Sequence, residues 1–316
     1  MNIWVNRNHS DAERRPRVYA GDIFVLPSSD ASLELCQLAR EMLKQAFAPH
    51  DPETAQFHFA VEEYAAILAE LKPAFIHHPE CKRLLPQILA TAGCDPRETY
   101  FDVPRLRTST SDGYLTSGIA YAFHPHRDTW YSAPQCQINW WIPVYDVLPE
   151  NGMEFFPRYF SEPVKNGSCD YNYYVWNRDN RAQAAQHVKK DTRRQPRPEE
   201  TLDITHPLRL VPMVGEIIVF SGAQLHASVE NSSGVARFSI DFRTVNRRDL
   251  KQDRGTPNID SECTGTTLRD FLNCSDLGRL DEGLVALYDR DGGPADAPKV
   301  FDPTQASRES LAVPKP

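Results

Sequence analysis

Long apolar stretches are missing from this sequence of 316 residues, in which no run of 18 apolar residues occurs. Because a membrane-spanning helix needs about 20 such residues, we expect no membrane span. Residues 1–17 are polar and lack the apolar centre of a secretory signal. The sequence therefore favours a cytoplasmic protein, and its mean hydropathy of -0.52 agrees with a polar surface.

Cysteine pairs with C-x-x-C spacing are missing too, although the chain has seven cysteines. An odd number without such pairs disfavours a disulfide framework and a zinc ribbon, so we expect free thiols in a reducing compartment. Positive charge is also scarce, because 35 lysines and arginines stand against 43 acidic residues, giving a net charge of -8. Since phosphate contacts need a basic surface, we expect no nucleic-acid partner.

The length and a hydrophobic content of 41% are enough for one large domain with a substantial core. We expect a single domain over residues 1–316, with a helical part at about 1–95, a core at 96–245 and a C-terminal extension at 246–316. Residues 158–207 interrupt the core. An insertion between core strands often carries function, and this one can form either a lid over a site or a solvated surface excursion.

Helices are expected in the first part of the chain, where apolar residues recur at spacings of three and four. A first helix begins near Asp30, a second covers Pro52–Leu71, and a third follows Pro79. Two short helices are expected near Thr267–Asn273 and Asp281–Asp289. The apolar stripe of the first helix consists of Leu33, Cys36, Ala39, Leu43 and Phe47.

Short segments rich in β-branched and aromatic residues follow Cys94, and turn residues separate them. They predict seven or eight strands. In one of them the alternation places Gln137, Asn139 and Trp141 on the same face. The predicted strands lie at about 99–108, 114–124, 135–145, 152–157, 208–222, 225–231 and 235–245.

A metal site is predicted from two histidines and one aspartate. His126 and Asp128 are two residues apart, so on an extended segment their side chains point to the same side. His226 follows about a hundred residues later, and a jelly-roll barrel pairs distant strands and can bring it beside the earlier two. Two imidazoles and one carboxylate form an iron(II) site with open positions for reactants. We predict that these three side chains bind the metal and carry catalysis, with His124 beside the site.

An anchor for a dicarboxylate cosubstrate is predicted on the last core strand. Arg237 stands eleven residues after His226, and a guanidinium fork binds a carboxylate through two parallel hydrogen bonds. This position suits the far carboxylate of 2-oxoglutarate. Ser239 shares the face of Arg237 and adds a hydroxyl, Ser228 points to the same side as His226, and Arg243 is a rival anchor.

The same pocket is expected to be lined by Asn139 and Trp141, which share a face on the strand after the metal pair. The alternative for each is an ordinary core position, which is the commoner place for a tryptophan.

Four motifs together resemble the iron(II)/2-oxoglutarate-dependent oxygenase superfamily, with the phytanoyl-CoA dioxygenase-like branch as the nearest type. They are H-R-D at 126–128, N-W-W-I-P-V-Y-D-V-L-P-E-N-G-M-E-F-F-P at 139–157, G-E-I-I-V-F-S-G-A-Q-L-H-A-S at 215–228 and R-F-S at 237–239. The resemblance covers about residues 98–245. It implies a mainly β fold with flanking helices, built on a double-stranded β-helix (jelly-roll, cupin-like) core.

The resemblance also implies a reaction. Iron(II), 2-oxoglutarate and dioxygen serve to hydroxylate an unactivated C–H bond of a small-molecule substrate, with succinate and CO2 as co-products. The presence of Asp128 disfavours halogenation and leaves hydroxylation, desaturation or ring closure. The family's usual P-G-S-H is replaced by Pro157-Arg158-Tyr159-Phe160, which leaves the substrate side open.

Two alternatives to this interpretation remain. A cupin-type metal dioxygenase or isomerase without 2-oxoglutarate would use His124-x-His126, but it leaves Arg237 unexplained. A non-catalytic barrel that only binds a ligand is the other alternative.

The insertion adds a hint about the substrate, and the sequence favours no particular oligomeric state. An aromatic cluster is followed there by a basic run, which suggests an anionic group on the substrate. The aromatic residues are Tyr171, Tyr173, Tyr174 and Trp176, and the basic residues are Lys189, Lys190, Arg193, Arg194 and Arg197.

Overall fold

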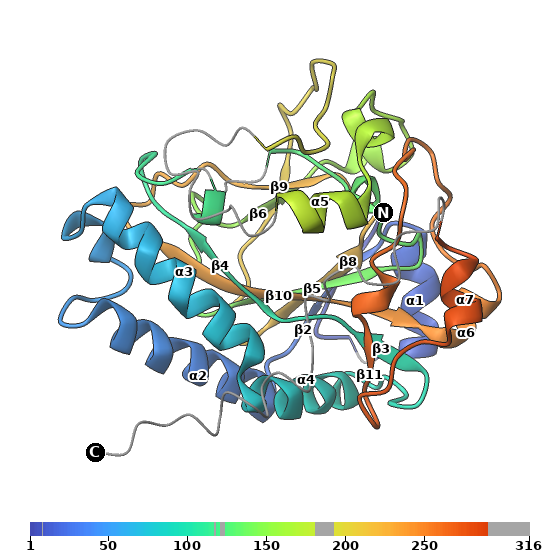
Figure 1. Ribbon diagram of the computed structural model, residues 1–316, viewed down its shortest axis with the longest axis horizontal. Coiled ribbons are helices and arrows are strands. Elements are labelled where there is room, and N and C mark those ends of the chain that lie inside the picture. Colours follow the sequence, from blue (N-terminus) through green and yellow to red (C-terminus); the bar gives the residue numbers. More distant parts are fainter. Residues whose placement is uncertain (8, 117, 121–123, 181–192, 290–316) are drawn as a thin grey trace.

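An eight-stranded sheet crosses the molecule and carries helices on its flanks in the computed structural model (Figure 1). The structure describes residues 1–7, 9–116, 118–120, 124–180 and 193–289. Among these residues, no helix combines the length and the apolar character that a membrane crossing requires.

The large sheet is antiparallel except for its first pair of strands, which is parallel. One long strand pairs with a neighbour on each side along most of its length. The order is β1 (Ile3–Val5), β2 (Ile23–Leu26), β8 (Ile217–Ser221), β5 (Ile138–Pro143), β10 (Arg237–Asn246), β3 (Thr99–Phe101) and β11 (Leu272–Asn273), and β4 (Arg105–Ser109) also pairs with β10.

A smaller sheet of three strands lies against the large one and consists of β7 (Leu208–Leu210), β6 (Met153–Phe155) and β9 (His226–Ser228). An isolated bridge pairs His126 with His226 at the edge of β9. The chain therefore alternates between the sheets, since β4, β5, β8 and β10 belong to the large one, while the bridge residue, β6, β7 and β9 belong to the small one. This alternation makes neighbours of segments that are far apart in the sequence.

The hydrophobic core consists of one large cluster of buried side chains on one face of the large sheet and smaller clusters between the two sheets. On β5 the two tryptophans divide these roles. Trp140 stacks on Phe242 of β10 with 5.7 Å between ring centroids and belongs to the large cluster, while Trp141 belongs to the smaller one with Phe155 of β6. Both faces of β5 are thus buried, as is typical of a central strand.

Helices cover the large cluster from the N-terminal part of the chain (Figure 1). Three of them, α2, α3 and α4, pack on one another. The helices are α1 (Asp11–Tyr19), α2 (Asp30–Phe47), α3 (Val61–His77), α4 (Pro79–Thr91), α5 (Tyr173–Asp179), α6 (Arg247–Lys251) and α7 (Glu282–Ala286). Short 3-10 turns occur at Ala55–Phe57, Gly118–Ala120, Asp128–Tyr131, Pro157–Phe160, Gly167–Asp170 and Leu268–Asp270.

Several boundaries differ from those predicted. The first expected helix forms at the expected residues, but Leu33 is 44% exposed and Leu35 takes its place in the buried stripe. The second begins at Val61 instead of Pro52, because the backbone amide of Ala60 is capped there by Glu63. It runs on to His77, past the predicted end.

Other segments change type. The described residues of 114–124 contain a 3-10 turn and no strand, and 267–273 holds a 3-10 turn followed by β11 instead of a helix. The N-terminal part is not only helical, because β1 and β2 add two strands to the large sheet. With three and four residues, these strands are too short for their alternation to stand out in the sequence.

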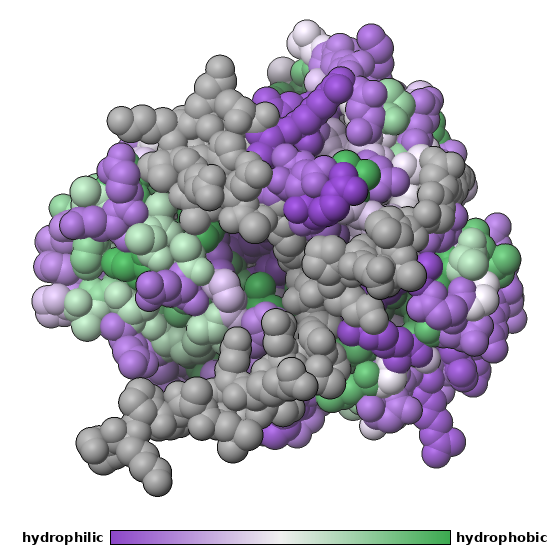
Figure 2. All heavy atoms as spheres, viewed as in Figure 1, coloured by the Kyte–Doolittle hydropathy of each residue, from purple (hydrophilic) through white to green (hydrophobic). Residues whose placement is uncertain are grey.

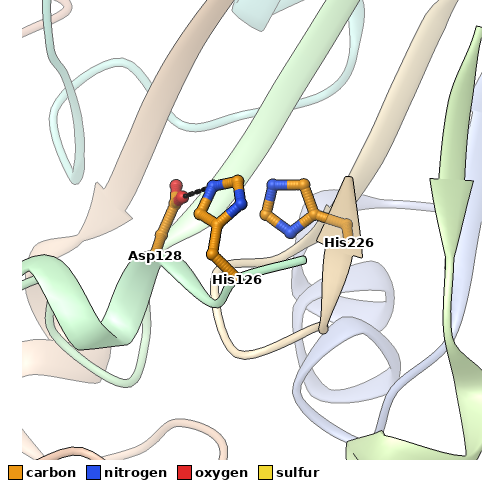
Figure 3. Close-up of side chains that lie close together, drawn as sticks. All are labelled: His126, Asp128 and His226. Atoms are coloured by element: carbon orange, nitrogen blue, oxygen red, sulfur yellow. Dashed lines mark ion pairs between the residues drawn. The ribbon is translucent and has the colours of Figure 1, made fainter. Parts of the chain in front are cut away.

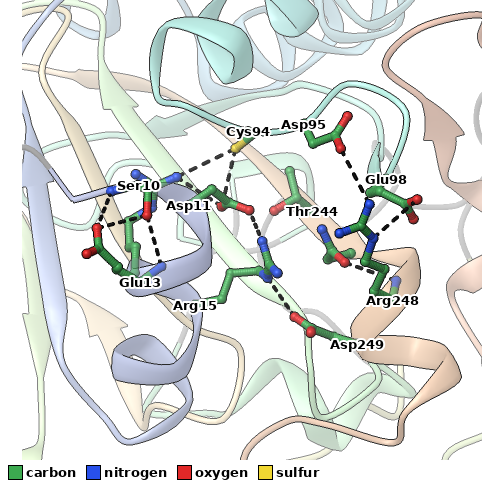
Figure 4. Close-up of polar contacts among 12 residues, drawn as sticks. Ser10, Asp11, Glu13, Arg15, Cys94, Asp95, Glu98, Thr244, Arg248 and Asp249 are labelled. Atoms are coloured by element: carbon green, nitrogen blue, oxygen red, sulfur yellow. Dashed lines mark hydrogen bonds and ion pairs between the residues drawn. The ribbon is translucent and has the colours of Figure 1, made fainter.

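A polar network fastens α1 to α6 (Figure 4). The buried carboxylate of Asp249 accepts hydrogen bonds from Nε of Arg15 at 2.6 Å and from the hydroxyl of Tyr19 at 2.8 Å. Arg15 also pairs with Asp11, which in turn accepts a hydrogen bond from Arg14. The network fixes the helix that follows β1 against the end of β10.

We expect Asp249→Ala to lower the free energy of unfolding by about 1–3 kcal/mol, because the buried hydroxyl of Tyr19 loses its acceptor and Arg15 keeps only Asp11 as a partner. Asp95→Ala is the matched control, since the ion pair of Asp95 with Arg248 is exposed and long at 4.0 Å, and it should cost less than about 1 kcal/mol. Urea unfolding of both variants measures the difference. Equal losses of unfolding free energy in the two variants would show that the buried network contributes no more to stability than the exposed ion pair.

Candidate metal centre

Three side chains from two segments meet between the sheets: His126, Asp128 and His226 (Figure 3). Nε2 of His126 lies 3.5 Å from Oδ1 of Asp128, and the ring centroids of the two histidines are 4.4 Å apart. Each residue offers one ligand atom within 4.8 Å of the others. In the part of the chain that the structure describes, no other group of three or more His, Cys, Asp or Glu has this property.

The segment that carries His126 and Asp128 is held by the residue between them. Arg127 has extended backbone angles and turns its side chain the opposite way, where it is 1% exposed. Its guanidinium donates to Asp260 at 2.9 Å and to the carbonyls of Ala223 at 2.6 Å, of Glu162 at 3.0 Å and of Tyr159. The role of Arg127 was not predictable from the sequence, because its partners are mostly backbone carbonyls that no residue pattern reveals.

Hydrogen bonds to backbone carbonyls fix the tautomer of both histidines. Nδ1 of His126 lies 2.9 Å from the carbonyl oxygen of His124, and Nδ1 of His226 lies 2.9 Å from that of Gln224. Since a carbonyl only accepts, Nδ1 carries the hydrogen and Nε2 keeps its lone pair for a metal. Burial and the neighbouring His126 lower the pKa of His226 to about 4, so this imidazole is neutral at physiological pH.

Asp128 is a carboxylate in this setting. Burial by itself would raise its pKa, but the adjacent imidazoles of His126 and His226 and the guanidinium of Arg243 outweigh burial and hold the pKa well below its usual range. Its Oδ2 accepts a hydrogen bond of 2.9 Å from the amide of Gln137. Two imidazoles that each present Nε2 and one carboxylate are a donor set that fits iron(II).

His124 lies outside this group. Its Nε2 is 3.0 Å from the carbonyl oxygen of Pro196, in the part of the insertion that follows residue 192. Burial lowers the pKa of His124 to about 4.

A cavity of about 550 Å3 opens beside the three side chains. Figure 2 shows a recess near the middle of the face that α3 and α5 border, with hydrophilic and hydrophobic atoms around it. Of the predicted site residues, Ser239 is absent from the lining, because its hydroxyl is buried behind Arg237. The others line the cavity: His126, Asp128, Asn139, Trp141, His226, Ser228 and Arg237.

Arg237 is a buried cation in the cavity wall, with 4% of its surface exposed. Its guanidinium donates to the hydroxyls of Ser239 at 2.7 Å and Ser228 at 3.1 Å and lies 5.5 Å from the ring centroid of Trp141. Its Nε has no hydrogen-bond partner, and within the described ranges no carboxylate forms an ion pair with it. Burial lowers its pKa to about 10, so the group remains charged and lacks a counter-ion.

The rival anchor Arg243 is already matched. It forms an ion pair with Asp102, a carboxylate that is 1% exposed, and the same carboxylate accepts a hydrogen bond of 2.8 Å from Arg105. Asn139 lies directly opposite Arg243 in the sheet and accepts a hydrogen bond of 3.0 Å from the amide of Gln137. An added anion would have to compete with the carboxylate of Asp102 at Arg243, whereas no described carboxylate is paired with Arg237.

Aromatic residues of the insertion, together with one from the 3-10 turn at 128–131, form part of the cavity wall. Tyr131 stands edge-on to His126 at 5.7 Å, Tyr171 packs on Tyr131 at 5.4 Å, and Trp176 on α5 follows at 6.3 Å. Tyr173 also lines the cavity, whereas the hydroxyl of Tyr174 turns to Asp289.

The predicted basic run divides between different environments. Lys189 and Lys190 lie outside the described residues. Arg193 lines the cavity, while the side chain of Arg194 is 82% exposed and pairs with Asp170.

Comparison with protein-family models found no match, and neither did comparison with curated proteins. Among solved structures, EvdO2 from Micromonospora carbonacea var. aurantiaca is 14% identical, with 77% of this chain and 93% of that chain covered and a TM-score of 0.42. The ThoJ–Ni complex, a non-heme monooxygenase, is 13% identical over 94% of each chain, with a TM-score of 0.37.

A third match is the non-heme alpha ketoglutarate dependent epimerase SnoN from nogalamycin biosynthesis, which is 12% identical, with 75% of this chain and 84% of that chain covered and a TM-score of 0.35. The reactions in these descriptions belong to those proteins, and likenesses this distant do not transfer them to this chain.

If the three side chains are the ligands, replacing any of them with alanine should weaken the binding of Ni(II), a redox-stable probe, at least tenfold. His124→Ala is the matched control and should bind Ni(II) as the wild type does, because its imidazole lies outside the donor group and its Nε2 contacts the carbonyl of Pro196. Isothermal titration of the metal-free proteins measures these affinities. Loss of binding in His124→Ala together with full binding in His126→Ala would reverse the assignment.

Proposed function

We propose that this protein is an iron(II)- and 2-oxoglutarate-dependent oxygenase that hydroxylates an unactivated C–H bond of a small molecule. The observation that carries the proposal is one cavity with two kinds of group in its wall. His126, Asp128 and His226 form a donor set for iron(II), and Arg237 is a buried guanidinium that forms no ion pair with any carboxylate of the described residues. A metal site alone would leave Arg237 as a buried charge with no purpose.

A double-stranded β-helix is the core architecture that we propose for this function. It is supported by the alternation of the chain between the two sheets and by the antiparallel pairing of β4, β10, β5 and β8 in the large sheet. The E-N-G turn before β6 supports a place near the phytanoyl-CoA dioxygenase-like branch.

Each part of the cavity has a role in this proposal. Nε2 of both histidines and the carboxylate of Asp128 would hold iron(II), while Arg237, supported by Ser228 and Ser239, would bind the far carboxylate of 2-oxoglutarate. Bound together, the iron and 2-oxoglutarate supply the activation of dioxygen that breaks a C–H bond, with succinate and CO2 as co-products.

The chain's own contribution is orientation and the exclusion of water. Gln137 occupies Oδ2 of Asp128 and so directs Oδ1 toward the metal position. Trp141 covers one face of the guanidinium, which strengthens its attraction to a carboxylate by keeping water away. Tyr131 and Tyr171 shield the histidine side of the cavity.

The presence of Asp128 favours hydroxylation, or a related desaturation or ring closure, over halogenation. The cupin-type alternative finds no support in the described residues, because His124 stands apart from the donor group and a reaction without 2-oxoglutarate gives Arg237 no ligand.

The proposal is tested by incubating the Fe(II)-loaded protein with 2-oxoglutarate, ascorbate and dioxygen and measuring succinate by mass spectrometry. A panel of small metabolites then identifies compounds that accelerate succinate formation and gain 16 mass units. Succinate that requires both iron and 2-oxoglutarate supports the proposal. A protein that binds iron but neither binds nor consumes 2-oxoglutarate contradicts it.

Asp128→Ala is expected to abolish 2-oxoglutarate turnover, since the remaining pair of imidazoles holds iron(II) weakly and leaves it misoriented. Succinate formation in the presence of excess Fe(II) measures the loss. Hydroxylation at the wild-type rate in this variant would disprove the ligand role of Asp128.

Arg237→Ala should raise the dissociation constant for 2-oxoglutarate at least about thirtyfold, because losing one partner of a buried charge pair costs about 2–5 kcal/mol. Arg243→Ala is the comparison and should change this constant much less, since Arg243 is matched by Asp102. Titration of the Ni(II)-loaded variants with 2-oxoglutarate measures both. The reverse order would place the anchor at Arg243.

A further inference from the structure

The walls of the cavity hold more positive charge than their carboxylates match. Six cationic side chains face two carboxylates among the described lining residues, and a third carboxylate, Asp102, lies behind and pairs with two of the cations. Iron(II) and the 2-oxoglutarate dianion carry opposite charges of equal size, so binding both leaves the excess unchanged. The cations are Lys72, Arg105, Arg107, Arg193, Arg237 and Arg243, and the lining carboxylates are Asp128 and Asp241.

The excess is most evident where α3 packs on β4 (Figure 1). Lys72 of α3 lines the cavity, and its ammonium donates a hydrogen bond to the backbone carbonyl of Ile119. No carboxylate forms an ion pair with it in the described part of the chain. Its neighbour Arg107 on β4 donates two hydrogen bonds to Asp241, from Nε to Oδ1 at 2.6 Å and from a terminal nitrogen to Oδ2 at 3.3 Å.

An ammonium in this position is costly to the empty protein. Burial, and after it the charge of Arg107, lower the pKa of Lys72 to about 7, against the opposing effect of Asp241. The nearest carboxylate is already committed to Arg107, so it cannot satisfy both cations. A partly buried charge of this kind becomes favourable when an anion reaches it and accepts its hydrogen bonds.

We propose that Lys72, which pairs with no carboxylate of the described residues, forms a subsite for an anionic oxygen group of the substrate, a carboxylate or a phosphate. The inference rests on the proposed function and deepens it by naming the substrate class, an organic acid or a phosphate ester. Arg237 is left for 2-oxoglutarate, because it lies on β10 opposite Ser109 of β4, whereas Lys72 belongs to α3.

The arrangement lets one substrate meet both the subsite and the metal position. Lys72 comes from α3, whereas the metal donors come from β9 and from the segment that leads into the 3-10 turn at 128–131, including the first residue of that turn. A molecule whose anionic end rests on the first wall can present a C–H bond to the second, and the aromatic rings of Tyr171 and Trp176 can cover its body.

A purely structural role for Lys72, holding the 3-10 turn at Gly118–Ala120 through the carbonyl of Ile119, predicts something different. In that case Lys72→Met lowers the melting temperature and does not alter which small molecules bind. For a binding role, the same substitution removes a partly buried charge that has no carboxylate partner among the described residues, so the melting temperature stays the same or rises while the preference for anions disappears.

The experiment measures binding of benzoate, phenyl phosphate and neutral benzyl alcohol to protein loaded with Ni(II) and 2-oxoglutarate. We expect at least one anion to bind wild type about tenfold or more tightly than benzyl alcohol, and the stronger of the two identifies carboxylate or phosphate. Lys72→Met should abolish this preference and Lys72→Arg should keep most of it. Lys44→Met, on the exposed side of α2, is the matched control and should behave as wild type.

The dissociation constant for 2-oxoglutarate separates the two proposals. Wild type that binds 2-oxoglutarate but shows no preference for anions overturns this inference alone, as does Lys72→Met with its preference intact. Wild type that fails to bind 2-oxoglutarate overturns the proposed function and this inference with it. A 2-oxoglutarate constant within threefold of wild type in Lys72→Met, combined with the lost preference, supports the subsite.

Discussion

The candidate site depends on one pair of backbone hydrogen bonds between two histidines about a hundred residues apart. The amide of His126 donates to the carbonyl of His226 at 3.0 Å, and the amide of His226 donates back to the carbonyl of His126 at 3.0 Å. Residues paired in this way on antiparallel strands point their side chains to the same face. The two imidazoles are therefore brought together by the main chain, and the extended residue Arg127 then sets Asp128 on the same side.

The cavity beside this pair keeps its charges in place through short-range partners. Asp102 holds Arg105 and Arg243, Asp241 holds Arg107, and the hydroxyls of Ser228 and Ser239 orient Arg237. Hydroxyls orient a guanidinium without neutralising it. The difference between hydroxyl-bound and carboxylate-bound cations separates the positions that are ready for a ligand from those that are already satisfied.

The sequence was most informative where a feature is local. Spacing of two placed His126 and Asp128 on one side, and helical periodicity located α2. Pairings between distant segments were not predictable in this way. That Asp102 neutralises Arg243, or that Gln137 donates to Asp128, depends on which strands become neighbours, and no spacing in the sequence encodes it.

The strand pleat likewise predicted the face of Ser239 correctly but not its depth. Its hydroxyl lies behind Arg237 and supports it instead of lining the cavity. The short strands β1 and β2 were missed because three or four residues form no readable pattern, and their place in the sheet is fixed by pairing with β8 and with each other.

The side chain of Arg127 has a mechanical consequence. It fastens the loop before β9, the turn after β6 and the segment around Asp260 to a single guanidinium, on the opposite side from the histidines. A shift of one residue between the segment around His126 and β9 would turn one imidazole away from the other. The same shift would break several hydrogen bonds of the Arg127 guanidinium. Arg127, whose side chain points away from the histidines, thus stabilises the strand register that keeps the two imidazoles together.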